Sequence, residues 1–206
     1  MNIVASLGPR TLRGKFVALE PLEERHHAAL IEAAADDNIW RHFPLDLRQG
    51  YAARLPFFVQ EMARGAQISY AVRRLADDAI VGSTSYLAIA PENARVEIGA
   101  TWYVAGAQGS AINPEAKYLL LENAFAANYN RVEFKTDSKN ARSRAALRKL
   151  GATEEGTLRG HMWMPQGYYR DSTYFSILAA EWPGVKDTLE KRLAGFETAT
   201  PAASRD

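Results

Sequence analysis

The sequence of 206 residues contains no cysteine. This absence excludes disulfide bonds, zinc sites with cysteine ligands, iron–sulfur clusters and every reaction that passes through a cysteine thioester. The chain also lacks a charge excess, because 25 Lys and Arg residues oppose 24 Asp and Glu residues, giving a net charge of +1. A general nucleic-acid-binding protein usually shows a marked basic excess, so nucleic acid is not an expected partner.

Long hydrophobic runs are missing as well. The longest purely aliphatic run, residues 119–121, is far too short to cross a membrane, and the first ten residues lack the apolar core of a signal peptide. We therefore expect a cytoplasmic location and no membrane partner. The length fits one well-packed domain, expected at residues 1–196, and the small polar residues 197–206 favour a frayed tail.

Hydrophobic periodicity predicts strands and helices that form a mixed α/β (α+β) layer with antiparallel and parallel portions. The expected strands cover about 13–21, 68–72, 80–89, 95–104, 131–136, 157–164 and 168–178. Four of the expected helices cover about 22–33, 51–62, 113–130 and 181–193. A further expected helix is capped by Asp137 and Ser138 and ends at residue 150. Strict alternation along 95–104 predicts one face with Val96, Ile98, Ala100, Trp102 and Val104, and another with Glu97, Gly99, Thr101 and Tyr103.

A loop of small residues precedes the third helix, at 105–112, and Asn113-Pro114-Glu115 is typical of a helix start. Backbone N–H groups at a helix N-terminus suit a pyrophosphate, and the expected donors here belong to residues 109–113. The alternative is an ordinary tight turn between strand and helix. Neither a Walker loop nor a dinucleotide-binding fingerprint occurs, which argues against a nucleoside triphosphatase or a nicotinamide enzyme.

Asn140, Ser143 and Leu147 fall on one face of the fourth expected helix. Residues 131–160 contain eight basic and four acidic side chains, a local charge of +4 within a nearly neutral chain. Such a patch suits a multiply phosphorylated small molecule, although a solvated helix face would look the same.

These motifs together resemble the GNAT superfamily of acetyl-CoA-dependent N-acetyltransferases, and within it the RimJ/RimL-like branch. The resemblance covers about residues 12–193. It is carried by Val96-Glu97-Ile98-Gly99, Gln108-Gly109-Ser110-Ala111, Asn140 with Ser143, Lys149-Leu150-Gly151-Ala152, and Asp171 with Tyr174-Phe175-Ser176-Ile177-Leu178.

The resemblance implies a V-shaped, mostly antiparallel sheet flanked by helices, with acetyl-CoA held between the strands at 95–104 and 131–136. The implied cofactor-binding residues are Thr101, Trp102, Tyr103, Val104, Gln108, Gly109, Ser110, Ala111, Ile112, Asn113, Asn140 and Ser143. The sequence departs from the family in two places. In the glycine loop, Gln108-Gly109 is shifted and Ile112-Asn113-Pro114 replaces further small residues, and Leu147 stands where many members carry a tyrosine proton donor.

The implied reaction is direct attack of a primary amine on the thioester, in a ternary complex and without a covalent enzyme intermediate. An alkylamine is neutral in only about one molecule in a thousand at pH 7, which is equivalent to roughly 4 kcal/mol of barrier. Glu97 and His161 are the candidate bases. The alternative for Glu97 is a surface carboxylate paired with Arg95 or Arg131, and the alternative for His161 is a packed, hydrogen-bonded core histidine. Ser143 could protonate the departing thiolate.

The acceptor is expected to be a protein N-terminus or a small amine. Trp40, His42, Phe43 and Asp171 are candidate substrate-binding residues. Their alternatives are aromatic packing under a loop for the first three, and a partner for a backbone or arginine group for Asp171. His26 and His27 have no metal-ligand spacing, so no metal is expected. A homodimer is compatible with the family, and a non-catalytic acyl-CoA-binding sensor or assembly module is the alternative function.

Overall fold

The computed structural model describes residues 3–44 and 51–199, with an eight-stranded mixed sheet. The strand order is β1-β2-β3-β4-β5-β6-β8-β7, and only β5 and β6 run parallel. The strands are β1 (Leu12–Arg13), β2 (Val17–Pro21), β3 (Ile68–Arg74), β4 (Ile80–Ala90), β5 (Arg95–Tyr103), β6 (Arg131–Asp137), β7 (Thr153–Met164) and β8 (Tyr168–Leu178). The mixed α/β fold class expected from the sequence is confirmed.

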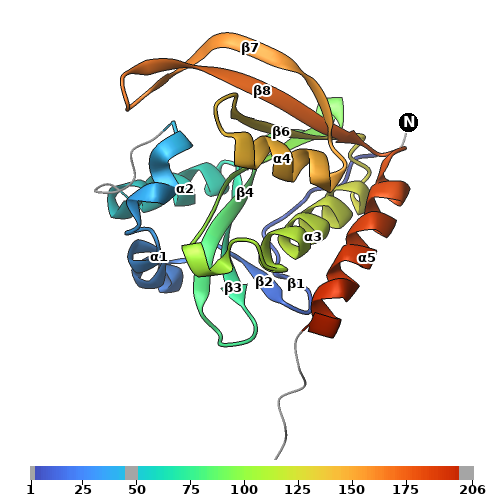
Figure 1. Ribbon diagram of the computed structural model, residues 1–206, viewed down its shortest axis with the longest axis horizontal. Coiled ribbons are helices and arrows are strands. Elements are labelled where there is room, and N and C mark those ends of the chain that lie inside the picture. Colours follow the sequence, from blue (N-terminus) through green and yellow to red (C-terminus); the bar gives the residue numbers. More distant parts are fainter. Residues whose placement is uncertain (1–2, 45–50, 200–206) are drawn as a thin grey trace, which may run out of the picture.

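Helices cover both faces of this sheet. The α-helices are α1 (His27–Ala33), α2 (Tyr51–Ala63), α3 (Ile112–Ala126), α4 (Ala141–Leu150) and α5 (Trp182–Ala199), and the short 3-10 helices are η1 (Glu24–His26), η2 (Asp37–His42), η3 (Pro91–Asn93) and η4 (Ala105–Ala107). In Figure 1, α1 and α2 lie on one side of β3 and β4, and α3 and α5 lie on the other. The long β7–β8 hairpin arches over the end of the molecule next to α4.

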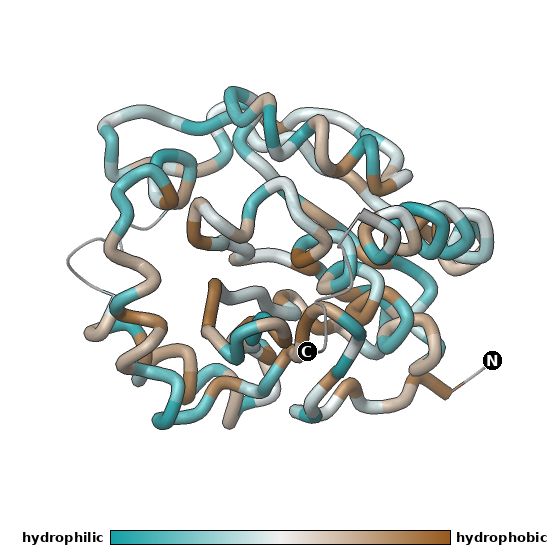
Figure 2. Tube along the Cα trace, turned by 60° about the horizontal axis from the view of Figure 1, so that its bottom comes forward, coloured by the Kyte–Doolittle hydropathy of each residue, from teal (hydrophilic) through white to brown (hydrophobic). Residues whose placement is uncertain are grey.

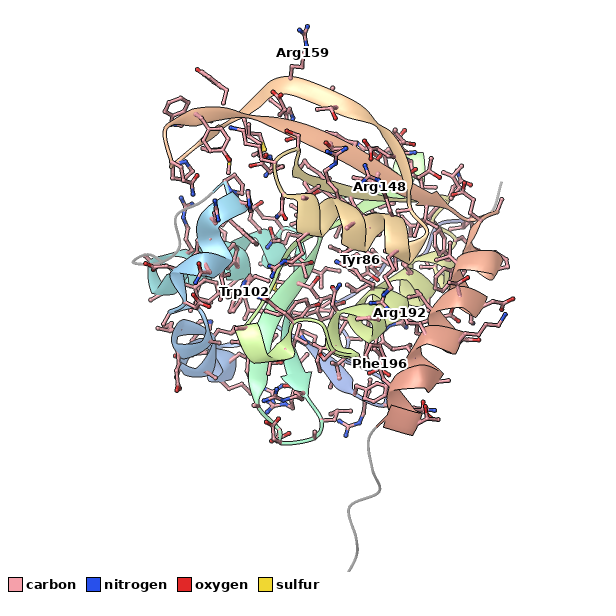
Figure 3. All side chains as sticks on the ribbon, in the orientation of Figure 1. Tyr86, Trp102, Arg148, Arg159, Arg192 and Phe196 are labelled. Carbon is pink, nitrogen blue, oxygen red and sulfur yellow. The ribbon has the colours of Figure 1, made fainter. Side chains whose placement is uncertain are left out.

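Each face has its own hydrophobic core. The larger core joins α3, α4 and α5 to the sheet through side chains such as Leu120, Leu147 and Leu189. The smaller core, under α1, η2 and α2, is built around Trp40 and Trp102. Figure 3 shows Trp102 on the α2 side of β4 and Tyr86 on the α3 side. We call these two sides the α3 face and the α2 face.

The two parallel strands pair over only three residues, with Arg95, Val96 and Glu97 of β5 opposite Arg131, Val132 and Glu133 of β6. Beyond that point the strands share no register, although β5 continues to Tyr103 and β6 to Asp137. The backbone edges of the two strands are therefore free to bind an extended ligand, as the expected V-shaped sheet requires.

Alternation along β5 breaks at Ala100, contrary to the sequence-based expectation. Ala100 adopts a left-handed conformation (φ 47°), and the register with β4 shifts between Ser83 and Ser85. This β-bulge changes which residues face which core. As a result, Tyr103 joins Ile98 in the larger core, whereas Trp102 joins the smaller one.

Several predicted boundaries need correction. The strand expected at 13–21 is instead a small hairpin, β1–β2. Glu115 of α3 accepts hydrogen bonds from the backbone N–H groups of Lys15 and Phe16 at its turn. Helix α3 begins at Ile112, so Asn113 lies inside its first turn and is not its N-cap. Asp137 ends β6, and Asn140 caps α4 in place of Asp137 and Ser138.

The ends of the expected elements also shift. Helix α5 runs to Ala199, so residues 197–199 are helical, and the rest of the expected tail lies outside the described residues. No described helix is long and apolar enough to cross a membrane. Figure 2 shows hydrophobic and hydrophilic residues alternating in short stretches along the trace.

Candidate functional site

The loop after β5 carries backbone N–H groups without protein partners. In the described residues, the N–H groups of Gly109, Ser110 and Ala111 have no acceptor, and Gly109 takes a left-handed conformation (φ 77°) that favours glycine. The Ser110 hydroxyl donates to Ala107 O at 2.7 Å and accepts from the N–H of Ile112 at 3.2 Å, which fixes the loop against the first turn of α3. These groups lie at the positive end of a 15-residue helix.

The start of α4 lies beside this loop. Asn140 caps the helix, since its side-chain oxygen accepts from the N–H of Ser143 at 3.0 Å. The Gln108 amide bridges the two segments, donating to Tyr103 O at 3.0 Å and accepting from Arg142. An open cleft of about 340 Å³ runs between η2, the loop and α4. It is lined by Asp36, Asn38, Arg41, His42, Ala105, Gln108, Asn140, Ala141 and Arg142.

This cleft brings together three predicted site residues from distant parts of the sequence: His42, Gln108 and Asn140. Ser143 is in the first turn of α4 and is not part of the cleft wall.

The positive patch at residues 131–160 is weaker than its composition indicates. Four of its eight basic side chains are in ion pairs: Arg131 with Glu133 and Glu155, Lys135 with Glu97, and Arg144 and Arg148 with Glu154. Arg142, which faces the cleft, has no carboxylate partner among the described residues. Arg142 is therefore the one basic side chain of this patch that lines the described cleft without an ion pair to a described residue.

Glu97 lies where β5 and β6 part, and it is buried on the α2 face. It pairs with Lys135 at 3.2 Å, so the alternative of a surface carboxylate paired with Arg95 or Arg131 is wrong, because Glu97 is buried and both arginines pair with Glu133. Gly99 makes room for the carboxylate: a Cβ at that position would lie 2.9 Å from Glu97 Oε1.

His161 extends from β7 over the same face. Its ring is exposed, packs edge-on against Tyr174 with the centroids 5.9 Å apart, and has Nδ1 2.9 Å from Ser172 Oγ. Partial burial lowers the pKa of His161 below 6.5, and the positive charges of Lys135 and Arg170 lower it further. A neutral imidazole near pH 7 can accept a proton.

A buried carboxylate, Asp137, anchors the end of β6. It accepts from the Tyr168 hydroxyl at 2.5 Å and from the N–H of Lys139 at 2.9 Å, and it lies 3.4 Å from His42 Nδ1. Burial raises the pKa of this carboxyl, but the hydrogen bonds from Tyr168, Lys139 and His42 outweigh burial and leave the pKa lowered. Asp137 thereby connects His42, at the cleft, to the end of β6.

The remaining predicted substrate residues are held by structural contacts. Trp40 is 1% exposed, packs on Phe43 and Trp102, and donates from Nε1 to Ala34 O at 2.8 Å. Asp171 Oδ1 accepts from the N–H of Gly160 at 2.7 Å and thus pins the irregular part of β7. The described part of the chain contains no group of three His, Asp or Glu side chains placed to hold a metal ion.

Lys117, which the sequence pattern did not single out, crosses the gap between β5 and β6 on the α3 face. Its Nζ donates to Thr101 Oγ1 at 2.9 Å on β5 and lies 5.7 Å from the ring centre of Phe134 on β6. Burial lowers the pKa of Lys117 to about 7, although the charge of Glu97 opposes the shift. A lysine in an otherwise apolar helix stretch was the only available signal.

Comparisons with known proteins agree with this geometry. The sequence profile of the acetyltransferase (GNAT) domain matches residues 17–153. YdaF of Bacillus subtilis (strain 168), named as a ribosomal N-acetyltransferase, is 32% identical over 113 residues, which are 54% of this chain and 61% of YdaF. The chain thus spans about three fifths of the length of the curated relatives that it matches.

Solved structures extend the likeness over most of the chain. A crystal structure from T. thermophilus, described as an acetyltransferase, superposes with a TM-score of 0.80 at 37% identity, covering 90% of this chain and 98% of that one. RimJ of Mycobacterium smegmatis, solved in complex with CoA-disulfide, superposes with a TM-score of 0.78 at 22% identity, covering 91% and 97%. At that identity RimJ supports the fold alone. The split mixed sheet is thus that of an acetyltransferase. The chain belongs to the acetyltransferase (GNAT) family.

Proposed function

We propose that the protein transfers the acetyl group of acetyl-CoA to a primary amine by direct attack in a ternary complex. The observation that carries the proposal is the parting of β5 from β6 after three paired residues, next to a loop with free N–H groups and two candidate bases. Acetyl-CoA supplies an activated acetyl thioester. The chain supplies a positive loop for its phosphates and an open strand edge for its extended arm.

The N–H groups of residues 109–111 and the Arg142 guanidinium would bind the pyrophosphate. Each is a donor without a carboxylate partner among the described residues. Arg142 lines the cleft beside Gln108 and Asn140, and residues 109–111 follow Gln108 directly in the loop. The backbone of residues 101–104 would pair with the pantetheine arm. Thr101 and Lys117 stiffen this stretch through their 2.9 Å hydrogen bond.

His161 is the better placed of the two bases. When its Nδ1 carries the proton and donates to Ser172 Oγ, the Nε2 lone pair is open to the acceptor amine. Glu97 already accepts a hydrogen bond from Lys135 at 3.2 Å, so its carboxylate is engaged by a neighbouring cation. We therefore assign proton removal to His161, and to Glu97 the role of holding Lys135 in place.

The reaction balances without a covalent enzyme intermediate. The amine nitrogen bonds to the acetyl carbonyl carbon, the carbon–sulfur bond breaks, and the amine proton passes to His161. The thiol of CoA has a pKa of about 8.5, so the thiolate leaves readily and Ser143 can donate to it directly or through water. Leu147 at the usual tyrosine position is compatible with this chemistry, because a good leaving group needs little acid assistance.

Two measurements test the proposal. Calorimetry measures binding of acetyl-CoA, and a free-thiol assay measures CoA release over a panel of small amines and peptides. Binding with acceptor-dependent release supports transfer. Binding without release on any acceptor favours the alternative, a non-catalytic acyl-CoA-binding module, and failure to bind excludes both.

The acceptor is a protein N-terminus or a small amine. YdaF, a relative named for ribosomal acetylation, favours a protein N-terminus. The panel should therefore pair each peptide with a small amine that presents the same terminal group.

A further inference from the structure

Arg170 on β8 is the one buried arginine among the described residues, at 4% exposure. Its Nε donates to Ser172 Oγ at 2.9 Å. Within residues 3–44 and 51–199, the two terminal nitrogens, Nη1 and Nη2, have no acceptor. Neither nitrogen is among the described side-chain atoms that are both fully buried and unpaired, so both keep some contact with solvent. A guanidinium has five N–H donors, and one of them is used by a described residue.

The carboxylates around Arg170 are committed elsewhere. Asp137 and Glu97 both act electrostatically on the guanidinium, but neither comes within ion-pair distance. Asp137 is occupied by Tyr168, Lys139 and His42. Glu97 is occupied by Lys135. Burying a charged group with open donors is costly, so a missing partner is expected at this position.

The open donors lie beside the proposed base. Arg170 and His161 both contact Ser172 Oγ, at the same distance of 2.9 Å. The positive charge of Arg170 also acts on the His161 ring. A group bound to Arg170 is therefore next to the position at which an acceptor amine would lose its proton.

We propose that Arg170 binds a carboxylate carried by the acceptor, so that the protein selects amines with a carboxylate close to the reacting nitrogen. This inference rests on the proposed function for the amine itself. The planar guanidinium fork matches a carboxylate in two parallel hydrogen bonds. A phosphate dianion would need further free cations, and the neighbouring Lys135 is already paired with Glu97.

The carboxylate of the acceptor is either that of an acidic side chain or the α-carboxylate of a free amino acid. Matched acceptor pairs distinguish these two sources. A peptide with N-terminal Asp is compared with the same peptide carrying Asn, and free alanine is compared with alaninamide. We expect kcat/KM for the acidic member of at least one pair to exceed that of its neutral partner tenfold or more. The pair that responds identifies the source as a side-chain carboxylate or an α-carboxylate.

Variants connect this preference to Arg170. Arg170→Gln should reduce the acidic-to-neutral ratio to about one, mainly by raising KM for the acidic acceptor, and Arg170→Lys should retain part of it. Arg159→Gln is the matched control, because Arg159 projects away from the molecule on the same hairpin (Figure 3). Equal turnover of both members by the unmodified protein, or an equal loss for both in Arg170→Gln, would overturn the inference.

A binding measurement decides the same question without acetyl transfer. Propionate and its neutral analogue propionamide are titrated while the His161 ring is followed by NMR. A carboxylate on Arg170 offsets the positive charge next to His161, so propionate should raise the pKa of His161 in the unmodified protein and not in Arg170→Gln. No response to propionate contradicts the carboxylate site, whereas absence of acetylation on every amine contradicts the proposed function.

Discussion

Glu115 and Arg170 are both buried charged groups, on opposite faces of the same sheet, but their surroundings differ. The Glu115 carboxylate accepts three backbone hydrogen bonds, from Lys15, Phe16 and Val17, at 2.6–2.8 Å. It closes the β1–β2 turn, where a Cβ at Gly14 would lie 2.3 Å from the carboxyl carbon. Arg170 makes one hydrogen bond to the residues that the structure describes, to Ser172 Oγ.

The difference separates structure from function within one molecule. On the α3 face the buried polar groups Glu115 and Asn123 are fully engaged with the protein, so they stabilise the fold. On the α2 face, Arg170 and His161 keep unused donors or lone pairs beside the strand gap. Three tyrosine hydroxyls on the α3 face, those of Tyr70, Tyr103 and Tyr129, also lack a partner among the described residues, so open donors alone do not mark a site. What favours a ligand at Arg170 is its position beside the proposed base.

The largest effect is expected from Glu115→Gln. The amide offers one acceptor oxygen in place of two charged ones and brings N–H groups toward backbone donors. The free energy of unfolding should fall by about 3 kcal/mol or more, as measured by denaturant titration. Glu197→Gln is the control, because Glu197 pairs with the exposed Lys15 side chain, and it should produce no measurable change. Loss of acetyl-CoA binding at unchanged stability would instead make Glu115 part of the site.

His161→Ala should reduce kcat/KM about a hundredfold, the usual size of a lost general base. In the unmodified protein, kcat/KM should fall as the pH drops through the His161 pKa, which lies below 6.5, because the protonated ring cannot accept a proton. The variant should lack this acidic limb. Glu97→Gln is measured in parallel. If neither variant loses tenfold, another group or water deprotonates the amine.

Lys117 gives a stability test on the α3 face. The folded protein releases the Lys117 proton near pH 7, whereas the unfolded chain retains it to about 10.5. The unfolded state therefore binds more protons between these values, and stability rises with pH across that window. Relative to Lys117→Met, the unmodified protein should gain about 1–2 kcal/mol of unfolding free energy between pH 7 and 9. Parallel pH curves for the two proteins would contradict the buried, shifted lysine.

The smallest effect is expected at the mouth of the cleft. Arg142→Gln should weaken acetyl-CoA binding by about threefold to tenfold, because an exposed cation contributes modestly to phosphate binding in salt. The loss should shrink as salt is added. Arg148→Gln is the control from the same helix, since Arg148 is paired with Glu154. Equal losses in both variants would indicate a diffuse positive surface in place of a phosphate contact at Arg142.

Much of the fold could be predicted from the sequence. Alternating and helical periodicities identify every long strand and each α-helix, because side-chain direction repeats every two residues in a strand and every 3.6 in a helix. The bulge at Ala100 could not be predicted, because a left-handed alanine has no sequence signature. Helix caps were misplaced for a related reason: Asp137, Ser138 and Asn140 are all acceptable N-caps, and only the packing of β6 chooses Asn140.

Sequence motifs also indicated site residues: the loop at 108–113, Asn140, Glu97 and His161. The roles of these residues in binding and catalysis remain predictions. Arg170 and Lys117 were missed. An arginine in a strand and a lysine in a helix are ordinary in sequence, and their importance depends on the partners that they lack.

The sequence by itself determined the order of the elements, the donor-rich loop and the absence of cysteine chemistry, because these depend on residue type and near neighbours along the chain. Only the tertiary structure decided which charged side chains have an ion-pair or hydrogen-bond partner. Glu97 pairs with Lys135, 38 residues away, and Asp137 meets His42, 95 residues away. Electrostatic pairing and burial depend on distance in space, so the same composition can give a saturated structural carboxylate at Glu115 and an open arginine at Arg170.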